Sequence, residues 1–279
     1  MSLQVTDRLD EDGHRWAAVR CTCDLSAQND DLIKATSELV RLAYGEDTIL
    51  DLWANLEPDP TVSETYDIEH LVGGFRLGLP NPAEETGGIE HMANYRSEST
   101  EMLARSALAI AYDALQFLVA PQAGKLNPNK PVLGFDGWAL LDDKKFGVAI
   151  VLVQVKGTKD TDCPPRESDT LAEECKAAPT RLGVISRMLT IMARSVDDTS
   201  VRATLLRMLA GLGKGKLPSI VVAPVLIRSA GKEAIGDLQP IIDVRADFAP
   251  VIGHGVSVLL GVNLNEFGRR VMDAARAAA

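Results

Sequence analysis

The sequence predicts an α/β protein whose core is a mixed β-sheet flanked by helices. Three observations lead to this fold class. From residue 97 onward the hydrophobic patterns follow the order helix, strand, strand, helix, strand. The run VAIVLVQVKG at 148–157 is apolar on both faces, which indicates a central strand buried on two sides. Alternation of such strands with helices is typical of α/β layers.

The N-terminal part of the chain predicts a smaller α+β region. Residues 15–23 read as a strand, and residues 30–45 carry apolar side chains at helical spacing before a terminal glycine. Residues 46–96 mix short elements with several prolines. We therefore expect two parts, an acidic N-terminal α+β region at 1–96 packed on a core at 97–279.

The core elements follow from the same patterns. A well-buried helix is expected from about residue 97, capped by Ser97, Ser99 or Thr100, with Leu103, Leu108, Ala111, Tyr112 and Leu115 on one stripe. A hairpin follows, and after it two helices, strands and a terminal helix are expected. Their ranges are strand 132–141, turn 142–147, strand 148–157, helix 165–195 broken near Pro179, helix 196–215 ended by glycines, strand 219–229, a short strand within 256–264 and helix 265–279.

Charge and composition limit the function classes. The chain has 279 residues and a net charge of −10. Residues 1–97 carry 19 acidic and 7 basic side chains, whereas residues 98–279 carry 20 and 22. This asymmetry is compatible with a protein-facing acidic part and a nucleic-acid-facing part, or with acids that only solubilise a helical subdomain. No apolar run is long enough to span a membrane, and the acidic start lacks a signal core, so a cytoplasmic protein with free thiols at its four cysteines is expected.

The hairpin carries the residues that point to chemistry. Because strand side chains alternate, Gln154 and Lys156 share one face, and antiparallel pairing would bring Asp136 beside them. A carboxylate and an amide oxygen are ligands for a hard divalent cation such as Mg²⁺. Lys156 would orient an attacking water or stabilise charge on a phosphate. The alternative is that Lys156 and Lys159 leave a strand into solvent and that Asp136-Gly137 makes a bend.

The order of elements resembles that of the PD-(D/E)XK, or restriction-endonuclease-like, superfamily. It consists of a helix, a strand with Asp, a hairpin, a strand that ends in (Asp/Glu/Gln)-x-Lys, a helix and a strand. The matching residues are Asp136 and Gln154-Val155-Lys156, within roughly residues 97–230. The glutamine is similar to that of the Mrr-like branch. The resemblance implies an α-β-β-β-α-β core with a site for Mg²⁺ or Mn²⁺ on Asp136, Gln154 and the Val155 carbonyl. It also implies a ligand from the preceding helix, for which Glu101 is preferred to Glu98 because the buried run follows it.

A finer resemblance is to the nuclease subunit of Hachiman antiphage defence systems, the DUF1837 family, in length, acidic N-terminal part and element order. It implies hydrolysis of DNA in phage defence beside a helicase partner. The acidic region would dock such a partner or cover the site. The family pattern is Glu-x-Lys, whereas this chain has Gln154 and Lys156. One carboxylate fewer makes the site less attractive to a dication.

Basic residues outside the hairpin are candidate contacts to a nucleic-acid backbone, or members of a solvated helical face: Lys159, Arg181, Lys214 and Lys216. The segment GLGKGKL at 211–217 follows a helix and precedes a strand, so it is expected to end the helix rather than to form a phosphate loop. His254, in GHG, is expected in a loop. Two further functions stay open: a non-catalytic interaction module on the same fold, which the glutamine favours, and a small-molecule enzyme that uses the glycine-rich turn.

Overall fold

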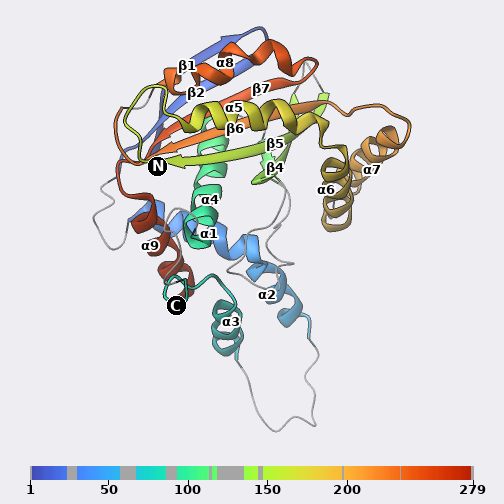
Figure 1. Cartoon of the computed structure of the whole chain (residues 1–279). Coiled ribbons are helices and arrows are strands. Elements are labelled where there is room, and N and C mark those ends of the chain that lie inside the picture. Colours follow the sequence, from blue (N-terminus) through green and yellow to red (C-terminus); the bar gives the residue numbers. More distant parts are fainter. Residues whose placement is uncertain are drawn as a thin grey trace. The chain divides into compact units, whose positions relative to one another are not determined.

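The structure is a computed structural model that describes residues 2–23, 30–56, 67–85, 93–112, 115–117, 135–143, 147–196, 198–232 and 234–277. Two compact units are distinguished (Figure 1), and each is discontinuous in sequence. Unit 1 is Met1–Cys23, Leu103–Val119 and Leu133–Leu264; unit 2 is Asp24–Met102, Ala120–Val132 and Asn265–Ala279. These units do not test the two parts expected from the sequence, 1–96 and 97–279, which stay a prediction.

Unit 1 contains a mixed seven-stranded sheet in the order β1-β2-β7-β6-β5-β4-β3, counted over the described residues. Parallel pairing joins β2 to β7, β7 to β6 and β6 to β5, whereas the remaining neighbours are antiparallel. The strands are β1 (Leu3–Glu11), β2 (His14–Cys21), β3 (Leu115–Phe117), β4 (Gly137–Asp143), β5 (Gly147–Thr158), β6 (Ile220–Arg228) and β7 (Ile252–Leu259). The mixed α/β class predicted from the sequence is confirmed.

The middle of the sheet is apolar on both faces. Every residue of β6 is buried, as expected for a β-branched strand between two parallel neighbours. Alternate residues of β4 and β5, among them Trp138, Ile150 and Leu152, face one hydrophobic core. The same core contains buried side chains of α5, α6 and α7, and Figure 1 shows α5 along the sheet with the α6–α7 pair beside its end. Their bounds are α5 (Glu167–Ala177), α6 (Leu182–Ser195) and α7 (Thr199–Gly213).

Short helical turns complete this layer. A 3-10 turn at Ala178–Thr180 contains Pro179 and separates α5 from α6, as the sequence predicts. Helix α8 (Gln239–Asp243) lies between the 3-10 turns η4 (Ile235–Leu238) and η5 (Arg245–Phe248). Helix α4 (Asn94–Ala111) crosses from unit 2 into unit 1 at Leu103. Its Arg105 lies beside Gly137 and Val153, on the sheet face opposite the Trp138 core.

Unit 2 consists of helices in the residues described. They are α1 (Asp31–Tyr44), α2 (Glu46–Ala54), α3 (Ile68–Leu77), the first half of α4, and α9 (Leu264–Arg276), which begins at the unit boundary. Asp30 caps α1 by accepting a hydrogen bond from the Leu32 N–H, and Gly45 ends it with a positive φ of 91°. None of the described helices is long and apolar enough to cross a membrane.

Three local expectations are wrong. Helix α4 starts at Asn94, so Ser97, Ser99 and Thr100 lie inside it rather than at its cap. The hydroxyls of Ser99 and Thr100 donate to the Tyr95 and Ser97 carbonyls of the preceding turn. Leu115 is not on the helical stripe but in β3. His254 lies in β7 and is 2% exposed, because the flanking glycines let the strand approach Trp16 closely.

Candidate active site

Asp136 is fixed beside β5 by two hydrogen bonds of opposite direction. Its backbone N–H donates to the Val153 carbonyl over 3.1 Å, just before β4 begins. The Val155 N–H donates to Asp136 Oδ2 over 2.6 Å. The side chain therefore continues the antiparallel ladder by one step, and the strand register positions the carboxylate. One carboxylate oxygen, Oδ1, is not used by this bond.

Gln154 and Lys156 lie on the face of β5 that carries Ile150 and Leu152, as alternation predicts. Gln154 is 4% exposed, and its Nε2 donates to the Val153 carbonyl over 3.2 Å. This arrangement leaves the amide oxygen as the end of the side chain that could ligate a cation. Lys156 reaches the surface and forms an ion pair with Glu174 of α5, with 2.6 Å between Nζ and Oε1.

Burial raises the pKa of Asp136 to about 6. The Val155 N–H, Lys156 and Arg181 act in the opposite direction, and the neighbouring charge of Glu174 raises the pKa further. Desolvation therefore outweighs the Val155 hydrogen bond and the positive charges of Lys156 and Arg181. A raised carboxyl pKa beside a lysine is typical of functional sites, and also of structural ion-pair networks.

Glu174 belongs to this site and was not predicted. Its Oε1 binds Lys156, while its Oε2 is buried without a hydrogen-bond partner among the residues that the structure describes. The sequence does contain a signal for it. Leu171 and Cys175 lie on the buried side of α5, and the buried Ala178 follows its last residue, so Glu174 lies at i+3 from Leu171 and i−4 from Ala178. An acid on the core side of an amphipathic helix is unusual enough to mark a candidate.

The donor set fits a hard divalent cation. Asp136, Gln154, the Val155 carbonyl and Glu174 all offer oxygen, which Mg²⁺ and Mn²⁺ prefer. The buried, unpaired Oε2 of Glu174 is the observation that favours a missing partner at this point. Within the described ranges, no three His, Cys, Asp or Glu side chains gather as a metal site. The carboxylates of this donor set are those of Asp136 and Glu174. Mg²⁺ commonly uses one or two carboxylates and keeps several waters.

The other predicted residues fall in three places. Arg181 belongs to the site, because its charge acts on Asp136 and its guanidinium lies 5.9 Å from the ring centre of Phe135. Lys159 is exposed just beyond β5. Glu101 is half-buried in the unit 2 part of α4, where its charge contributes to raising the pKa of Tyr44.

Lys214 and Lys216 do not lie with Lys156 in the site. Both are exposed after α7, where Lys214 is the C-cap residue and Gly215 has a positive φ of 72°, so the glycine-rich segment ends the helix as predicted. They precede β6, whose Ile220 pairs with Ile150, whereas Lys156 pairs with Leu226. At about 3.3 Å per residue, the six-residue offset places the start of β6 roughly 20 Å from Lys156 along the strands.

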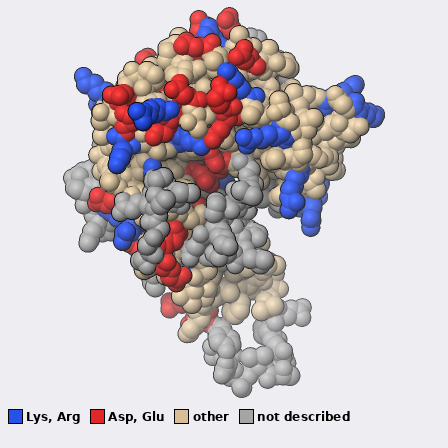
Figure 2. Space-filling view, in the orientation of Figure 1, with Lys and Arg blue, Asp and Glu red and all other residues tan. Residues whose placement is uncertain are grey.

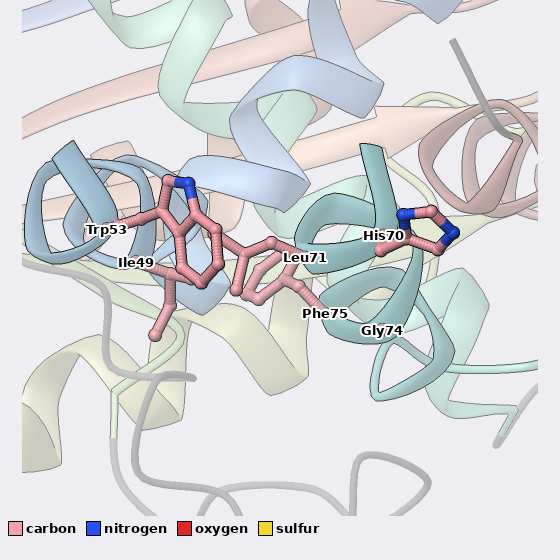
Figure 3. A pocket seen from close by; sticks show the side chains of 6 residues that line it. All are labelled: Ile49, Trp53, His70, Leu71, Gly74 and Phe75. Atoms are coloured by element: carbon pink, nitrogen blue, oxygen red, sulfur yellow. The ribbon is translucent and has the colours of Figure 1, made fainter. Parts of the chain in front are cut away.

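An apolar pocket of about 420 Å³ lies between α2 and α3 in unit 2. Figure 3 shows the side chains of Ile49, Trp53, Leu71 and Phe75 gathered between the two helices. The remaining lining residues are His70 and Gly74, and His70 Nδ1 lies 2.6 Å from Asp67 Oδ1, within hydrogen-bond distance. The lining has no arrangement of acid, base and nucleophile, so the pocket suits apolar contact rather than catalysis.

No protein-family model matches the chain, and no curated protein matches it in sequence. A functional assignment therefore depends on the residues and geometry of the site itself.

Proposed function

We propose that this chain is a metal-dependent nuclease of the restriction-endonuclease-like fold that hydrolyses phosphodiester bonds in DNA. One observation carries the proposal. Asp136, just before β4, accepts a 2.6 Å hydrogen bond from the Val155 N–H of β5, and Val155 is flanked by Gln154 and Lys156, which share one face. A carboxylate and an ammonium around a cation site are the groups that phosphodiester hydrolysis needs.

The element order supports the fold assignment. Helix α4 is followed by β3, β4 and β5, then by α5 and, after the α6–α7 pair, by β6. This is the α-β-β-β-α-β order expected for the core. The antiparallel β4–β5 pair and the parallel β5–β6 pair also agree with a mixed sheet of that kind.

The residues of the site would divide the work as follows. Asp136 and Gln154, with the Val155 carbonyl, would hold Mg²⁺ or Mn²⁺. The cation supplies Lewis-acid polarisation of the phosphate and makes a bound water more acidic. Lys156 would orient the attacking water or stabilise the charge on the phosphate. Because the Lys156 side chain is 30% exposed, a substrate phosphate can reach it from solvent.

The α6–α7 pair supports a nucleic acid as the substrate. Residues 182–218 carry six basic and two acidic side chains in a chain whose net charge is −10. Figure 2 shows Lys and Arg side chains over α6 and α7. The exposed ones are Arg187, Arg194, Arg207, Lys214 and Lys216. With Arg181 and Lys159 near the site, they would contact the phosphate backbone along the duplex.

The acidic N-terminal region would dock a partner protein, for which a helicase in a prokaryotic antiphage defence system is the preferred candidate. Exposed side chains of unit 2 favour a protein as the partner, because the region of α2 and α3, which border the apolar pocket, also exposes large apolar side chains. These are Leu52, Leu56, Ile68 and Leu77, which are 52–75% exposed.

A second candidate function is a non-catalytic module on this fold that binds a partner protein or nucleic acid. Gln154 favours it, because a neutral amide replaces the carboxylate of the Glu-x-Lys pattern. In that case the Asp136–Val155 bond only extends the ladder, and the Lys156–Glu174 pair only fastens α5 to the sheet.

Plasmid cleavage by the full-length chain with Mg²⁺ or Mn²⁺ separates the two functions. The nuclease is expected to nick or cut plasmid DNA only with the dication, and Asp136→Ala and Lys156→Ala are expected to abolish cleavage. The module predicts DNA that stays intact under every condition. Cleavage that is unchanged in both variants would sink the assignment of the site.

A further inference from the structure

We propose that Glu174 of α5 supplies the second carboxylate of the metal site, in place of the acid that Gln154 lacks. The inference rests on the proposed metal-dependent function and adds a ligand from a different element. Asp136 comes from the start of β4, Gln154 from β5, and Glu174 from the helix that covers this sheet face.

Glu174 is positioned by its contact with Lys156. Its Oε1 lies 2.6 Å from Lys156 Nζ, and the side chain is 27% exposed, so it borders both the core and the solvent. Lys156 follows directly after Val155, whose N–H donates to Asp136 Oδ2 over 2.6 Å, so Glu174 and Asp136 are both bonded to consecutive residues of β5. The two carboxylates therefore share one neighbourhood, with Lys156 between strand and helix.

An ion pair with Lys156 does not account for the whole side chain. One carboxylate oxygen satisfies the ammonium, but Oε2 is buried and accepts no hydrogen bond from any group in the described part of the chain. A buried acceptor without a donor loses its hydrogen bonds to water without replacement, and this destabilises the fold more when the acceptor is charged. A second acid nearby increases this destabilisation through repulsion. A dication between Asp136 and Glu174 would remove both penalties at once.

The same arrangement gives Lys156 two roles, one before and one after a cation binds. Without a cation, its ammonium compensates the charge of Glu174. With a cation bound, Glu174 is compensated by the metal, and Lys156 becomes available to the attacking water or the phosphate. Lys156 and the dication thus compete for Glu174, and removal of the lysine is expected to strengthen metal binding rather than weaken it.

Mn²⁺ binding to the full-length chain without DNA, measured by the electron paramagnetic resonance signal of free Mn²⁺, tests the inference. Glu174→Gln is expected to weaken Mn²⁺ binding by about tenfold or more, since a carboxylate ligand is lost. Glu173→Gln is the matched control, because Glu173 is the adjacent exposed residue and pairs with Lys176. It is expected to bind Mn²⁺ like the unaltered chain.

Two further variants distinguish metal ligation by Glu174 from a purely structural role. Gln154→Glu in the Glu174→Gln chain returns a carboxylate to the site and is expected to restore Mn²⁺ binding. In a Lys156→Met chain, Glu174→Gln is still expected to lose affinity, although no lysine remains to be paired.

Two results would overturn the inference in different ways. If Asp136→Asn abolishes Mn²⁺ binding while Glu174→Gln binds normally, Glu174 is only the partner of Lys156, and the proposed function survives. If the unaltered chain binds no Mn²⁺ at millimolar concentration, the metal-dependent function itself fails, and the role of Glu174 fails with it.

Discussion

The backbone N–H of Val155 donates a 2.6 Å hydrogen bond to the side chain of Asp136. This bond ties the carboxylate to the strand that carries Gln154 and Lys156, so the register of β4 on β5 sets the geometry of the site. Burial at this position raises the pKa of Asp136 to about 6, against an ordinary value of 3.8. Asp136 therefore destabilises the metal-free fold when it is ionised.

The first prediction concerns stability and pH. Because the pKa of Asp136 is higher in the folded chain, folding favours its protonated form, so its contribution to stability is full below pH 4 and is lost as the pH rises through 6. Asp136→Asn removes this dependence and keeps an oxygen for the Val155 N–H. At pH 8 with EDTA, we expect the variant to unfold with a free energy higher by about 3 kcal/mol.

Urea unfolding of both chains at pH 8 and pH 4 measures this difference. The two chains should become similar at pH 4, where both side chains are neutral. Asp51→Asn, at an exposed position of α2, is the control and should change stability little at either pH. An equal effect of Asp136→Asn at both pH values would contradict the prediction.

Lys156→Ala should separate chemistry from metal binding. Lys156 acts on the water or the phosphate, so we expect cleavage of plasmid DNA to fall by about 10²–10⁴-fold, while Mn²⁺ binding is retained or improved. Lys159→Ala removes an exposed lysine three residues further along and should keep most of the cleavage activity. Loss of metal binding in Lys156→Ala, or equal cleavage by the two variants, would argue against the assigned role.

Neutralising the surface of α6 should weaken DNA binding without altering the site. Arg187 and Arg194 are exposed and seven residues apart, so they project from the same side of the helix about 10 Å from each other. For Arg187→Gln with Arg194→Gln, we expect weaker binding to duplex DNA and a salt dependence reduced by about 0.9 per lost phosphate contact.

Fluorescence anisotropy at several salt concentrations measures that slope, with Asp136→Ala present in all chains to prevent cleavage. The control is Lys34→Gln with Lys232→Gln, which removes the same charge from exposed positions outside α6 and α7. A slope that changes as much in the control would assign the effect to net charge rather than to the α6 surface.

The neighbours of a side chain within a hairpin can be predicted from the sequence, whereas contacts between a helix and the sheet cannot. Asp136, Gln154 and Lys156 could be placed together because strand side chains alternate and a hairpin fixes its own register. The pairing of Lys156 with Glu174 could not, since it depends on how α5 packs on the sheet. Strand β1 was also not predicted, because it pairs with β2 alone and most of its residues are exposed, so its apolar residues show no clear alternation.

The loop after β5 depends on a buried ion pair that was likewise not predicted. Arg228 and Asp237 are 1% and 0% exposed and form an ion pair. Arg228 Nη2 also donates to the carbonyls of Asp160 and Asp162, over 3.0 and 2.9 Å, and Ser257 Oγ donates to Asp237 over 2.7 Å. The pair therefore fastens the segment that follows Lys156 to the end of β6.

Asp237→Ala leaves the Arg228 charge buried without its partner and should lower the free energy of unfolding by about 3–5 kcal/mol. Asp243→Ala, at an exposed position of α8, should lower it by less than about 1 kcal/mol. Guanidinium unfolding at pH 7 measures both. A similar, small loss in the two variants would show that the buried pair is not needed for stability.

The most direct test of the metal site is anomalous diffraction from crystals of the full-length chain soaked in millimolar Mn²⁺. The account predicts a Mn²⁺ peak about 2.0–2.5 Å from oxygens of Asp136, Gln154 and the Val155 carbonyl. A peak that also contacts Glu174 would agree with its assignment as the second carboxylate. An ordered site without a peak, in which Asp136 contacts only the Val155 N–H and Glu174 only Lys156, would contradict the account and favour the non-catalytic module.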